Sequence, residues 1–279
     1  MMEEIWRFID TGALSPALNM AVDEAILQIH GEGRVPPTLR FYTWNPATLS
    51  VGYFQRAEKE IDFNRLKEEG IGFVRRPTGG RAVLHDKELT YSIVVSEGYP
   101  GIPATVTDSY RFFSLGLMEG FRQLGLPVEM VKLDSESEKG KQASLGTAAC
   151  FDSPSWYELV LGERKIAGSA QMRQRGVILQ HGSILIDLDA DLLFSLFRFP
   201  SEEVRQRGKR LFLKRAVAIN EERMHSPATL EEVKGAFAEG FRKGLGIRLI
   251  EGELTKEEWI LAERLAREKY GTDAWNLRR

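Results

Sequence analysis

The sequence is poor in cysteine and histidine, which limits the covalent and metal chemistry open to it. Its 279 residues include one cysteine, Cys150, and four histidines. A single thiol cannot form an internal disulfide, and a cysteine-based zinc site needs several thiols. The histidines also lack the carboxylate spacing of a metal motif. We therefore expect no metal site and a reducing, intracellular setting.

Long apolar runs and a strong excess of one charge are also missing. No run approaches the roughly 20 apolar residues of a membrane span, and residues 1–10 lack the apolar core of a signal peptide. The 38 Lys and Arg residues nearly balance 40 Asp and Glu residues. This balance argues against a dedicated nucleic-acid binder. The sequence predicts a cytoplasmic protein with neither membrane nor nucleic-acid partner.

Residues 75–86 contain three arginines, two adjacent glycines and a His-Asp pair. Adjacent glycines permit a turn whose bare amides approach a ligand, while the arginines supply positive charge. The stretch has neither the Gly-Lys-Ser/Thr ending of a P-loop nor the three-glycine dinucleotide fingerprint. Taken alone it predicts a phosphate or acyl-anion cradle, with a basic hairpin turn as the simpler interpretation. The candidate ligand contacts are Arg75, Arg76, Thr78, Gly79, Gly80, Arg81 and His85.

Hydrophobic periodicity predicts an α+β fold, with a mixed, largely antiparallel sheet flanked by helices. Strands are expected at 38–42, 47–54, 71–76, 89–95, 156–161, 165–172 and 176–187. Helices are expected at 16–31, 62–69 and 105–125 and after the capping-box residues Thr229 and Thr255. Residues 75–86 should join two neighbouring strands, and the polar segment 132–147 should be a mobile surface loop.

We expect two units along the chain. Residues 1–202 would form a catalytic domain, with its core at 33–202 and a possible extension to 248, and residues 203–279 a mostly helical C-terminal subdomain. No Pro/Gly/Ser-rich linker marks the boundary.

Cys150 follows the polar segment and precedes a predicted strand. A free cysteine is usually a small buried hydrophobe, but one at a loop–strand junction is open to substrate. An unperturbed thiol is only a few per cent thiolate at neutral pH, so an active one needs a neighbouring cation. Lys165, on the next predicted strand, is the nearest candidate.

The segment after Lys165 is small-sided and nearly apolar, which suits a narrow channel for a linear chain. Regular alternation would place Lys165, Ala167 and Ser169 on one strand face. Gly168 leaves the strand open to close approach, and Ala170 would bound the channel. A solvated lysine in a turn is the simpler alternative.

Two histidines have neighbours that suggest a role, and two do not. His85 belongs to the glycine-arginine stretch, and His181 stands in a strand before Gly182. Either could equally be a core histidine bonded to the backbone. His30 and His225 have no companions and receive no role.

Six cations fall between residues 205 and 215. The simpler interpretation is that these six side chains are solvated on the protein surface. If they share one helix face, they would form a landing patch for an acidic protein.

Three motifs together resemble the biotin and lipoate protein ligase superfamily, and within it the octanoyltransferases. They are the stretch 75–86, Lys165-Ile-Ala-Gly-Ser-Ala-Gln, and His181-Gly-Ser-Ile-Leu. The likeness extends from Trp6 to Trp275. In that family a cysteine matching Cys150 carries the acyl group as a thioester, and a lysine matching Lys165 is held to lower its pKa.

The resemblance implies transfer of an octanoyl group from acyl carrier protein to a lysine of the glycine cleavage H protein, the first step of lipoate synthesis. It implies no cofactor and no ATP, because the group arrives on the carrier's phosphopantetheine. A lid such as segment 132–147 would exclude water. The stretch 75–86 would then be a wall of the acyl pocket, and its arginines would contact the phosphopantetheine arm or be inherited from adenylate-forming relatives.

Other activities stay open at this point. An amidotransferase that moves octanoyl or lipoyl groups from H protein to other lipoyl domains would use the same cysteine. An ATP-dependent lipoate ligase would use the arginines and need no cysteine. A non-catalytic binder of lipoyl domains would form no covalent adduct.

Overall fold

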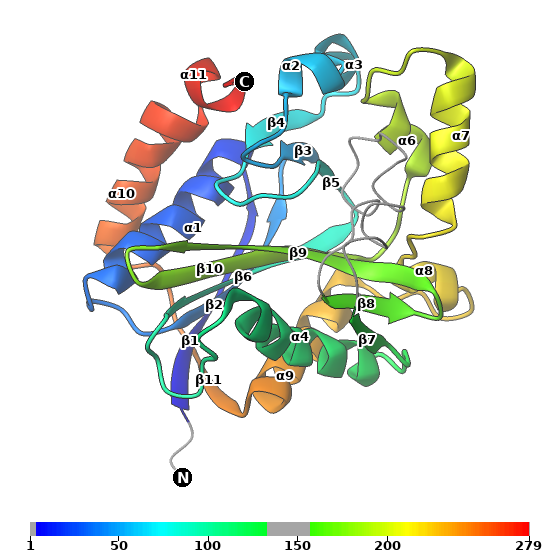
Figure 1. Ribbon diagram of the computed structural model, residues 1–279. Helices are drawn as coiled ribbons and strands as arrows, with labels where there is room; N and C mark the ends of the chain where they lie inside the picture. Colours follow the sequence, from blue (N-terminus) through cyan, green and yellow to red (C-terminus); the bar gives the residue numbers. More distant parts are fainter. Residues whose placement is uncertain (1–3, 133–156, 279) are drawn as a thin grey trace.

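A sheet of eight strands passes through the protein (Figure 1). The computed structural model describes residues 4–132 and 157–278. The strand order is β11 (Ile247–Glu251), β1 (Glu4–Leu14), β2 (Thr38–Trp44), β6 (Glu88–Ser96), β10 (Val177–Leu185), β9 (Arg164–Gln174), β8 (Tyr157–Leu161) and β7 (Glu129–Lys132). Strand β1 is parallel to β11 and β2, and the remaining neighbours are antiparallel. The predicted mixed, largely antiparallel sheet is confirmed.

A second, smaller sheet contains β4 (Gly72–Arg75), β3 (Thr48–Val51) and β5 (Val83–His85). Around it pack α2 (Ala57–Glu60), α3 (Phe63–Glu68), α6 (Ala190–Ser195) and α7 (Glu202–Leu213). The expectation that 75–86 joins two neighbouring strands is wrong, because β4 and β6 belong to different sheets. This stretch leaves the small sheet after β4, returns to it as β5, and only then leads to β6 of the large sheet. It therefore bridges the two sheets.

Helices cover both faces of the large sheet. On one face lie α4 (Val106–Gln123) and α9 (Leu230–Leu245), and on the other α1 (Pro16–Gly31) and α10 (Lys256–Leu265), which continues as η2 (Ala266–Tyr270). Two short helices, α8 (Ile219–Glu222) and α11 (Asp273–Asn276), follow α7 and η2 respectively. Thr105, Thr229 and Thr255 cap their helices through their side chains, because each hydroxyl satisfies an otherwise free amide of the first turn.

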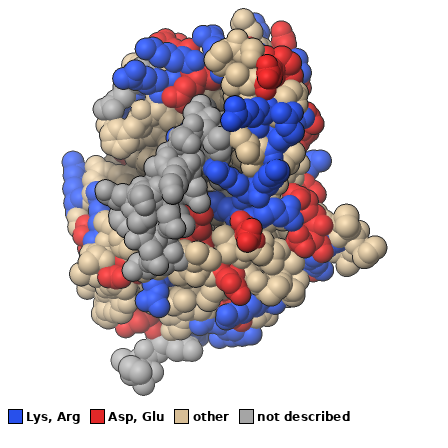
Figure 2. All heavy atoms as spheres, turned by 45° about the vertical axis from the view of Figure 1, so that its right-hand side comes forward, with Lys and Arg blue, Asp and Glu red and all other residues tan. Residues whose placement is uncertain are grey.

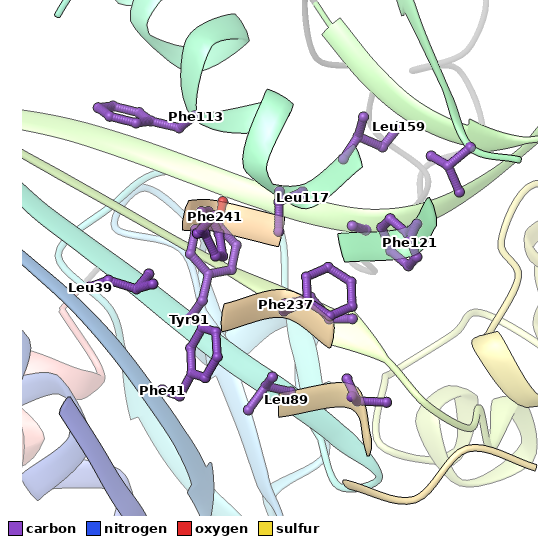
Figure 3. Packing of buried hydrophobic residues seen from close by; sticks show 14 of the residues in the cluster. Leu39, Phe41, Leu89, Tyr91, Phe113, Leu117, Phe121, Leu159, Phe237 and Phe241 are labelled. Atoms are coloured by element: carbon purple, nitrogen blue, oxygen red, sulfur yellow. The ribbon is translucent and has the colours of Figure 1, made fainter. Parts of the chain in front are cut away.

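The larger part of the core lies under α4 and α9 (Figure 3). The ring of Phe241 lies 5.2 Å from that of Tyr91, and Phe121 meets Phe237 edge-on at 4.9 Å. The two helices approach closely through glycines. A Cβ on Gly240 would lie 2.3 Å from the backbone nitrogen of Gly120, so no larger residue fits without separating the helices.

The C-terminal residues contribute to both sides of this architecture. Strand β11 pairs with β1, α9 packs against α4, and α10 packs against α1. The boundary expected near residue 203 stays a prediction. Neither β1 nor β11 was expected from the sequence.

Strand alternation gives the large sheet one apolar face and one partly polar face. On β6, Leu89, Tyr91, Ile93 and Val95 join the core under α4 and α9. Their neighbours Thr90 and Ser92 point to the opposite face, as His181 and Ser183 do on β10. This second face is apolar near α1 and polar beside residues 76–85, and a pocket lies there.

Candidate active site

The pocket lies between the polar face of the large sheet and the stretch that bridges the sheets. It encloses about 430 Å³, part of which is open to solvent. Its walls combine apolar and polar side chains with glycines: Met20, Tyr42, Trp44, Ser50, Arg76, Gly80, Val83, His85, Thr90, Gly168, Ser169, Ala170, His181, Gly182 and Ser183.

The structure gathers most of the predicted site residues around this one space. Residues from 76–85, from β9 and from β10 meet there although they are far apart in sequence. Four candidates from the bridging stretch, Arg75, Thr78, Gly79 and Arg81, are not among its lining residues. Met20, Tyr42, Trp44 and Ser50 also line the pocket, although no sequence pattern had indicated them.

Backbone packing explains the adjacent glycines. Gly80 has φ +92°, a left-handed conformation that favours glycine. A Cβ on Gly52 would lie 1.9 Å from the carbonyl oxygen of Gly80, so the turn rests directly on the end of β3. Gly79 has an ordinary φ and open space around its Cα. Gly80 and Gly52 are thus required by the geometry, whereas Gly79 is not.

Arg76 holds this turn from inside. Its guanidinium donates to the carbonyl oxygens of Gly79 at 2.8 Å and Arg81 at 2.7 Å and to Ser50 Oγ at 3.2 Å. The residue is 5% exposed. A buried cation that donates to carbonyl oxygens fixes the conformation of the pocket wall.

Arg75 is fully buried and points elsewhere. It donates to the carbonyl oxygens of Gly52, Tyr53 and Gln55 and to that of Asn276 near the C-terminus. These contacts tie β4 to α11. Its binding of substrate stays a prediction.

A chain of buried hydrogen bonds supports the turn from the large sheet. Thr78 Oγ1 lies 2.6 Å from His181 Nε2, and His181 Nδ1 lies 3.2 Å from Asp23 Oδ2. Since the Asp23 carboxylate can only accept, the proton is on Nδ1 and Nε2 accepts from Thr78. Burial lowers the pKa of His181, which keeps the ring neutral.

Asp23 is the centre of this network. Burial raises its pKa, but Arg40 at 2.7 Å and the hydrogen bond from His181 outweigh that effect, and the pKa lies below its usual value. Tyr42 and Ser92 also donate to the carboxylate. Asp23 was not among the predicted site residues, although a carboxylate inside the apolar run of α1 was an available signal.

His85, which also lines the pocket, forms a similar network. Its Nε2 lies 2.8 Å from Ser50 Oγ and its Nδ1 lies 3.2 Å from Glu88 Oε1. The ring stacks on Trp44 at 4.3 Å between centroids, and Thr90 Oγ1 donates to Glu88 at 2.5 Å. Two histidine–carboxylate pairs therefore stiffen the pocket.

Lys165 lies on the pocket face of β9, which regular alternation did not predict. Lys165 pairs with Val160, but Ala167 pairs with Leu159, so β9 has one extra residue, Ile166. Such a β-bulge changes which face the following residues occupy. Because Ala167 and Leu159 both join the core under α4, Lys165 lies on the opposite face. The expectation that Lys165 and Ala167 share a face is wrong.

This bulge gives Lys165 the same orientation as Gly168 and Ala170, which line the pocket. Three residues of strand span about 10 Å, so Lys165 lies beyond one end of the pocket. Its side chain is 7% exposed, and its ammonium lies 3.2 Å from Glu158 Oε1. Lys165 thus places a buried cation close to the pocket.

Two of the sequence predictions fall on residues that the structure does not describe. They are Cys150 and the segment 132–147, apart from the backbone of residue 132. Within residues 4–132 and 157–278, no helix is long and apolar enough to cross a membrane, and no three His, Cys, Asp or Glu side chains are grouped as metal ligands.

Comparison with known proteins points to lipoate metabolism. The family model described as the lipoyl protein ligase A/B catalytic domain matches residues 15–242. The chain is 62% identical to octanoyltransferase LipM of Brevibacillus brevis over 276 residues, covering 99% of this chain and 100% of that one. It is 56% identical to octanoyltransferase LipM of Bacillus subtilis over 279 residues, with both chains covered completely.

Solved structures show the same fold. A bipartite lipoate protein ligase from Thermoplasma acidophilum is similar with a TM-score of 0.80 and 29% identity, covering 100% of this chain and 98% of that one. Lipoate-protein ligase A bound with ATP follows with a TM-score of 0.77 and 28% identity, covering 99% of each chain.

Proposed function

Because the chain belongs to the lipoyl protein ligase A/B catalytic domain family, we propose that it transfers an octanoyl group from acyl carrier protein to the glycine cleavage H protein through a thioester on Cys150. The chain is an octanoyltransferase of lipoate biosynthesis, like its relatives from Brevibacillus brevis and Bacillus subtilis. The donor, the acceptor and the covalent intermediate are the proposed parts. The acceptor atom is the side-chain amine of one lysine of the H protein.

The observation that carries this mechanism is the buried ammonium of Lys165 on the pocket face of β9. The only thiol of the sequence, Cys150, precedes Tyr157, the first residue of β8, by seven positions, and β8 pairs with β9. A cation near a thiol lowers its pKa, because it stabilises the thiolate. The pairing of β8 with β9 supports our proposal that Lys165 is the electrostatic partner of the Cys150 thiolate.

In the first step the Cys150 thiolate attacks the thioester carbonyl of the octanoyl carrier. A bond forms between its sulfur and the carbonyl carbon, the carrier's sulfur leaves, and that thiolate takes a proton from solvent. Backbone amides of the Gly79–Gly80 turn and of the Cys150 segment would stabilise the oxyanion.

In the second step the acceptor lysine attacks the Cys150 thioester as a neutral amine. The new amide bond forms, the carbon–sulfur bond breaks, the nitrogen releases one proton to solvent, and the Cys150 thiolate is restored. Between the steps the octanoyl chain lies along Gly168 and Ala170, and water must be excluded to prevent hydrolysis. Neither step needs ATP or another cofactor, and none is proposed.

The test uses Cys150→Ala and Cys150→Ser variants incubated with octanoyl carrier protein. Wild-type protein should gain roughly 126 Da, the mass of an octanoyl group replacing a proton on the nucleophile, and the Cys150→Ala variant should gain nothing. Because Cys150 is the one cysteine of the sequence, a thioester adduct can form only on Cys150. Undiminished transfer by Cys150→Ala would refute the thioester mechanism.

A Lys165→Met variant tests the electrostatic part separately. We expect its rate of alkylation by iodoacetamide to follow a thiol pKa nearer the ordinary 8.5, which means less thiolate at neutral pH. An unchanged pH profile of alkylation would show that Lys165 does not stabilise the thiolate.

The alternative activities give different results in the same assays. A strict requirement for ATP and free octanoic or lipoic acid would indicate a ligase. Transfer only to lipoyl domains of dehydrogenases, with octanoyl H protein as donor, would indicate an amidotransferase. Acceptors should therefore be compared side by side.

A further inference from the structure

Helix α7 carries a basic stripe on its outer surface. Its buried residues, Gly208 and Phe212, face the small sheet and α6, where Phe212 packs on Phe194 at 5.4 Å between ring centroids. At 100° per residue, Arg207, Arg210 and Lys214 project within about 60° of each other on the opposite side. All three side chains are exposed. We call Arg207, Arg210 and Lys214 the α7 stripe.

Two other cations of this segment, Arg205 and Lys209, have acidic partners. Arg205 is paired with Glu202 at 2.6 Å, and Lys209 with Asp191 of α6 at 2.5 Å. Among residues 4–132 and 157–278, the three side chains of the α7 stripe form no ion pair. Figure 2 shows Lys and Arg gathered on the face that carries this helix. The net charge of the whole chain is only −2, so the stripe reflects local segregation of charge.

Apolar side chains flank the stripe. Val204 is 44% exposed on one side of it and Leu213 is 41% exposed on the other. Exposed charges between exposed apolar residues combine long-range attraction with a contact that excludes water. The stripe therefore has the composition of a protein-docking surface.

The C-terminal end of α7 leads directly to the candidate catalytic lysine. The amide of Lys165 donates to the carbonyl of Arg215 at 2.6 Å, and the amide of Val217 donates to the carbonyl of Lys165 at 3.0 Å. Lys214 is adjacent in sequence to this pairing, and Arg207 lies about 10 Å further along the helix. A protein bound on the stripe would thus lie next to the β8–β9 hairpin.

We propose that the α7 stripe is the docking surface for the donor, an acidic carrier protein that presents its octanoyl group on a phosphopantetheine arm. This assignment rests on the proposed donor. The carrier's acidic residues meet Arg207, Arg210 and Lys214, and its arm extends past Lys214 towards Lys165. The stripe acts mainly on the encounter rate, which local charge raises by about 10- to 1,000-fold.

The test compares two triple variants with the same change of charge. The first is Arg207→Glu, Arg210→Glu and Lys214→Glu. The control is Lys256→Glu, Arg264→Glu and Arg267→Glu, three exposed cations on α10 and η2, which lie on the other side of the protein (Figure 1). If the first variant folds poorly by circular dichroism, the corresponding Gln triple replaces it.

At low salt, kcat/KM for octanoyl carrier protein should fall tenfold or more in the α7 variant and less than twofold in the control. The deficit should shrink as ionic strength rises, because screening weakens the attraction in the wild type. Transfer from octanoyl-pantetheine, which has no carrier protein, should be equal in both variants. Equal behaviour of the two triples towards the carrier would overturn the proposal.

Two further measurements separate this proposal from the proposed function. A loss confined to KM for the H protein would show that the stripe binds the acceptor, which also overturns it. Binding of fluorescently labelled holo-carrier protein is followed by anisotropy without any transfer. If the wild type binds the carrier through α7 but forms no thioester, the docking surface stands and the mechanism on Cys150 fails.

Discussion

The contact between Gly52 and the Gly79–Gly80 turn predicts that Gly52→Ala damages the enzyme although the new side chain is a single methyl group. The added carbon would lie 1.9 Å from the carbonyl oxygen of Gly80 and 2.8 Å from its carbonyl carbon. Ordinary carbon–oxygen contacts are roughly 3.3–3.6 Å. The turn would therefore have to move by about 1.5 Å, because both partners are backbone atoms and neither can rotate away.

This displacement has two measurable consequences. Overpacking of this kind costs about 1–3 kcal/mol of stability. The turn also forms a wall of the pocket, and a misplacement of about 1 Å in a positioning element can lower the rate about 100-fold. We expect Gly52→Ala to lose stability by that amount and to lower kcat/KM for octanoyl transfer by about two orders of magnitude.

The assay combines urea denaturation with octanoyl transfer to the H protein. Gly98→Ala is the control, because Gly98 also lies in a loop, has an ordinary φ and has no atom within 4 Å of a new Cβ. It should resemble the wild type in both measurements. If Gly52→Ala were as stable and as active as Gly98→Ala, the turn would not be held against β3 as the structure shows.

Two further predictions concern α9 and His181. Gly240→Ala should destabilise the protein by about 1–2 kcal/mol, since the overpacking against α4 exceeds the gain in helix propensity. The control Gly235→Ala lies on the same helix with open space around it and should stabilise the protein by about 0.5–1 kcal/mol. Equal free energies of unfolding in urea for the two variants would contradict the close helix contact. Because burial lowers the pKa of His181, the unfolded state binds a proton below about pH 6.5 that the folded state resists, so stability falls as pH falls. His181→Asn should reduce that slope by up to about 1.4 kcal/mol per pH unit. The free energy of unfolding in urea is measured for both proteins from pH 7 to pH 5, and an equal decrease in the two would contradict the assignment.

The local parts of the fold could be predicted from the sequence because their signals are local. Thr105, Thr229 and Thr255 cap the predicted helices, and seven predicted strands appear with boundaries shifted by a few residues. Strand β1 escaped prediction because much of it is exposed and its apolar residues do not alternate cleanly. Strand β11 has only five residues, and its place is set by pairing with β1, which is distant in sequence.

Part of the pocket lining could be predicted from the sequence, but the hydrogen bonds that connect its side chains could not. His85 and His181 were recognised as candidates, but their partners were not. Thr78 and His181 are 103 residues apart, and His181 and Asp23 are 158 residues apart. Such pairs form only when two sheets and α1 are assembled, and no local pattern encodes them. The contacts of the arginines could not be predicted either. Their charge alone did not indicate that Arg75 and Arg76 donate hydrogen bonds to backbone carbonyl oxygens.

The position of Lys165 depends on one extra residue in β9, which forms a β-bulge. Regular alternation would place Lys165 on the face of Ala167, among the apolar residues under α4, where an unpaired ammonium is very costly. The extra residue Ile166 instead turns Lys165 to the face of Gly168, where Glu158 is its partner. With this arrangement the apolar residues Ile166 and Ala167 lie in the core, while the charged Lys165 lies on the pocket side of the sheet. The β-bulge at the end of β9 therefore places the ammonium of Lys165 on the same face of the sheet as the pocket.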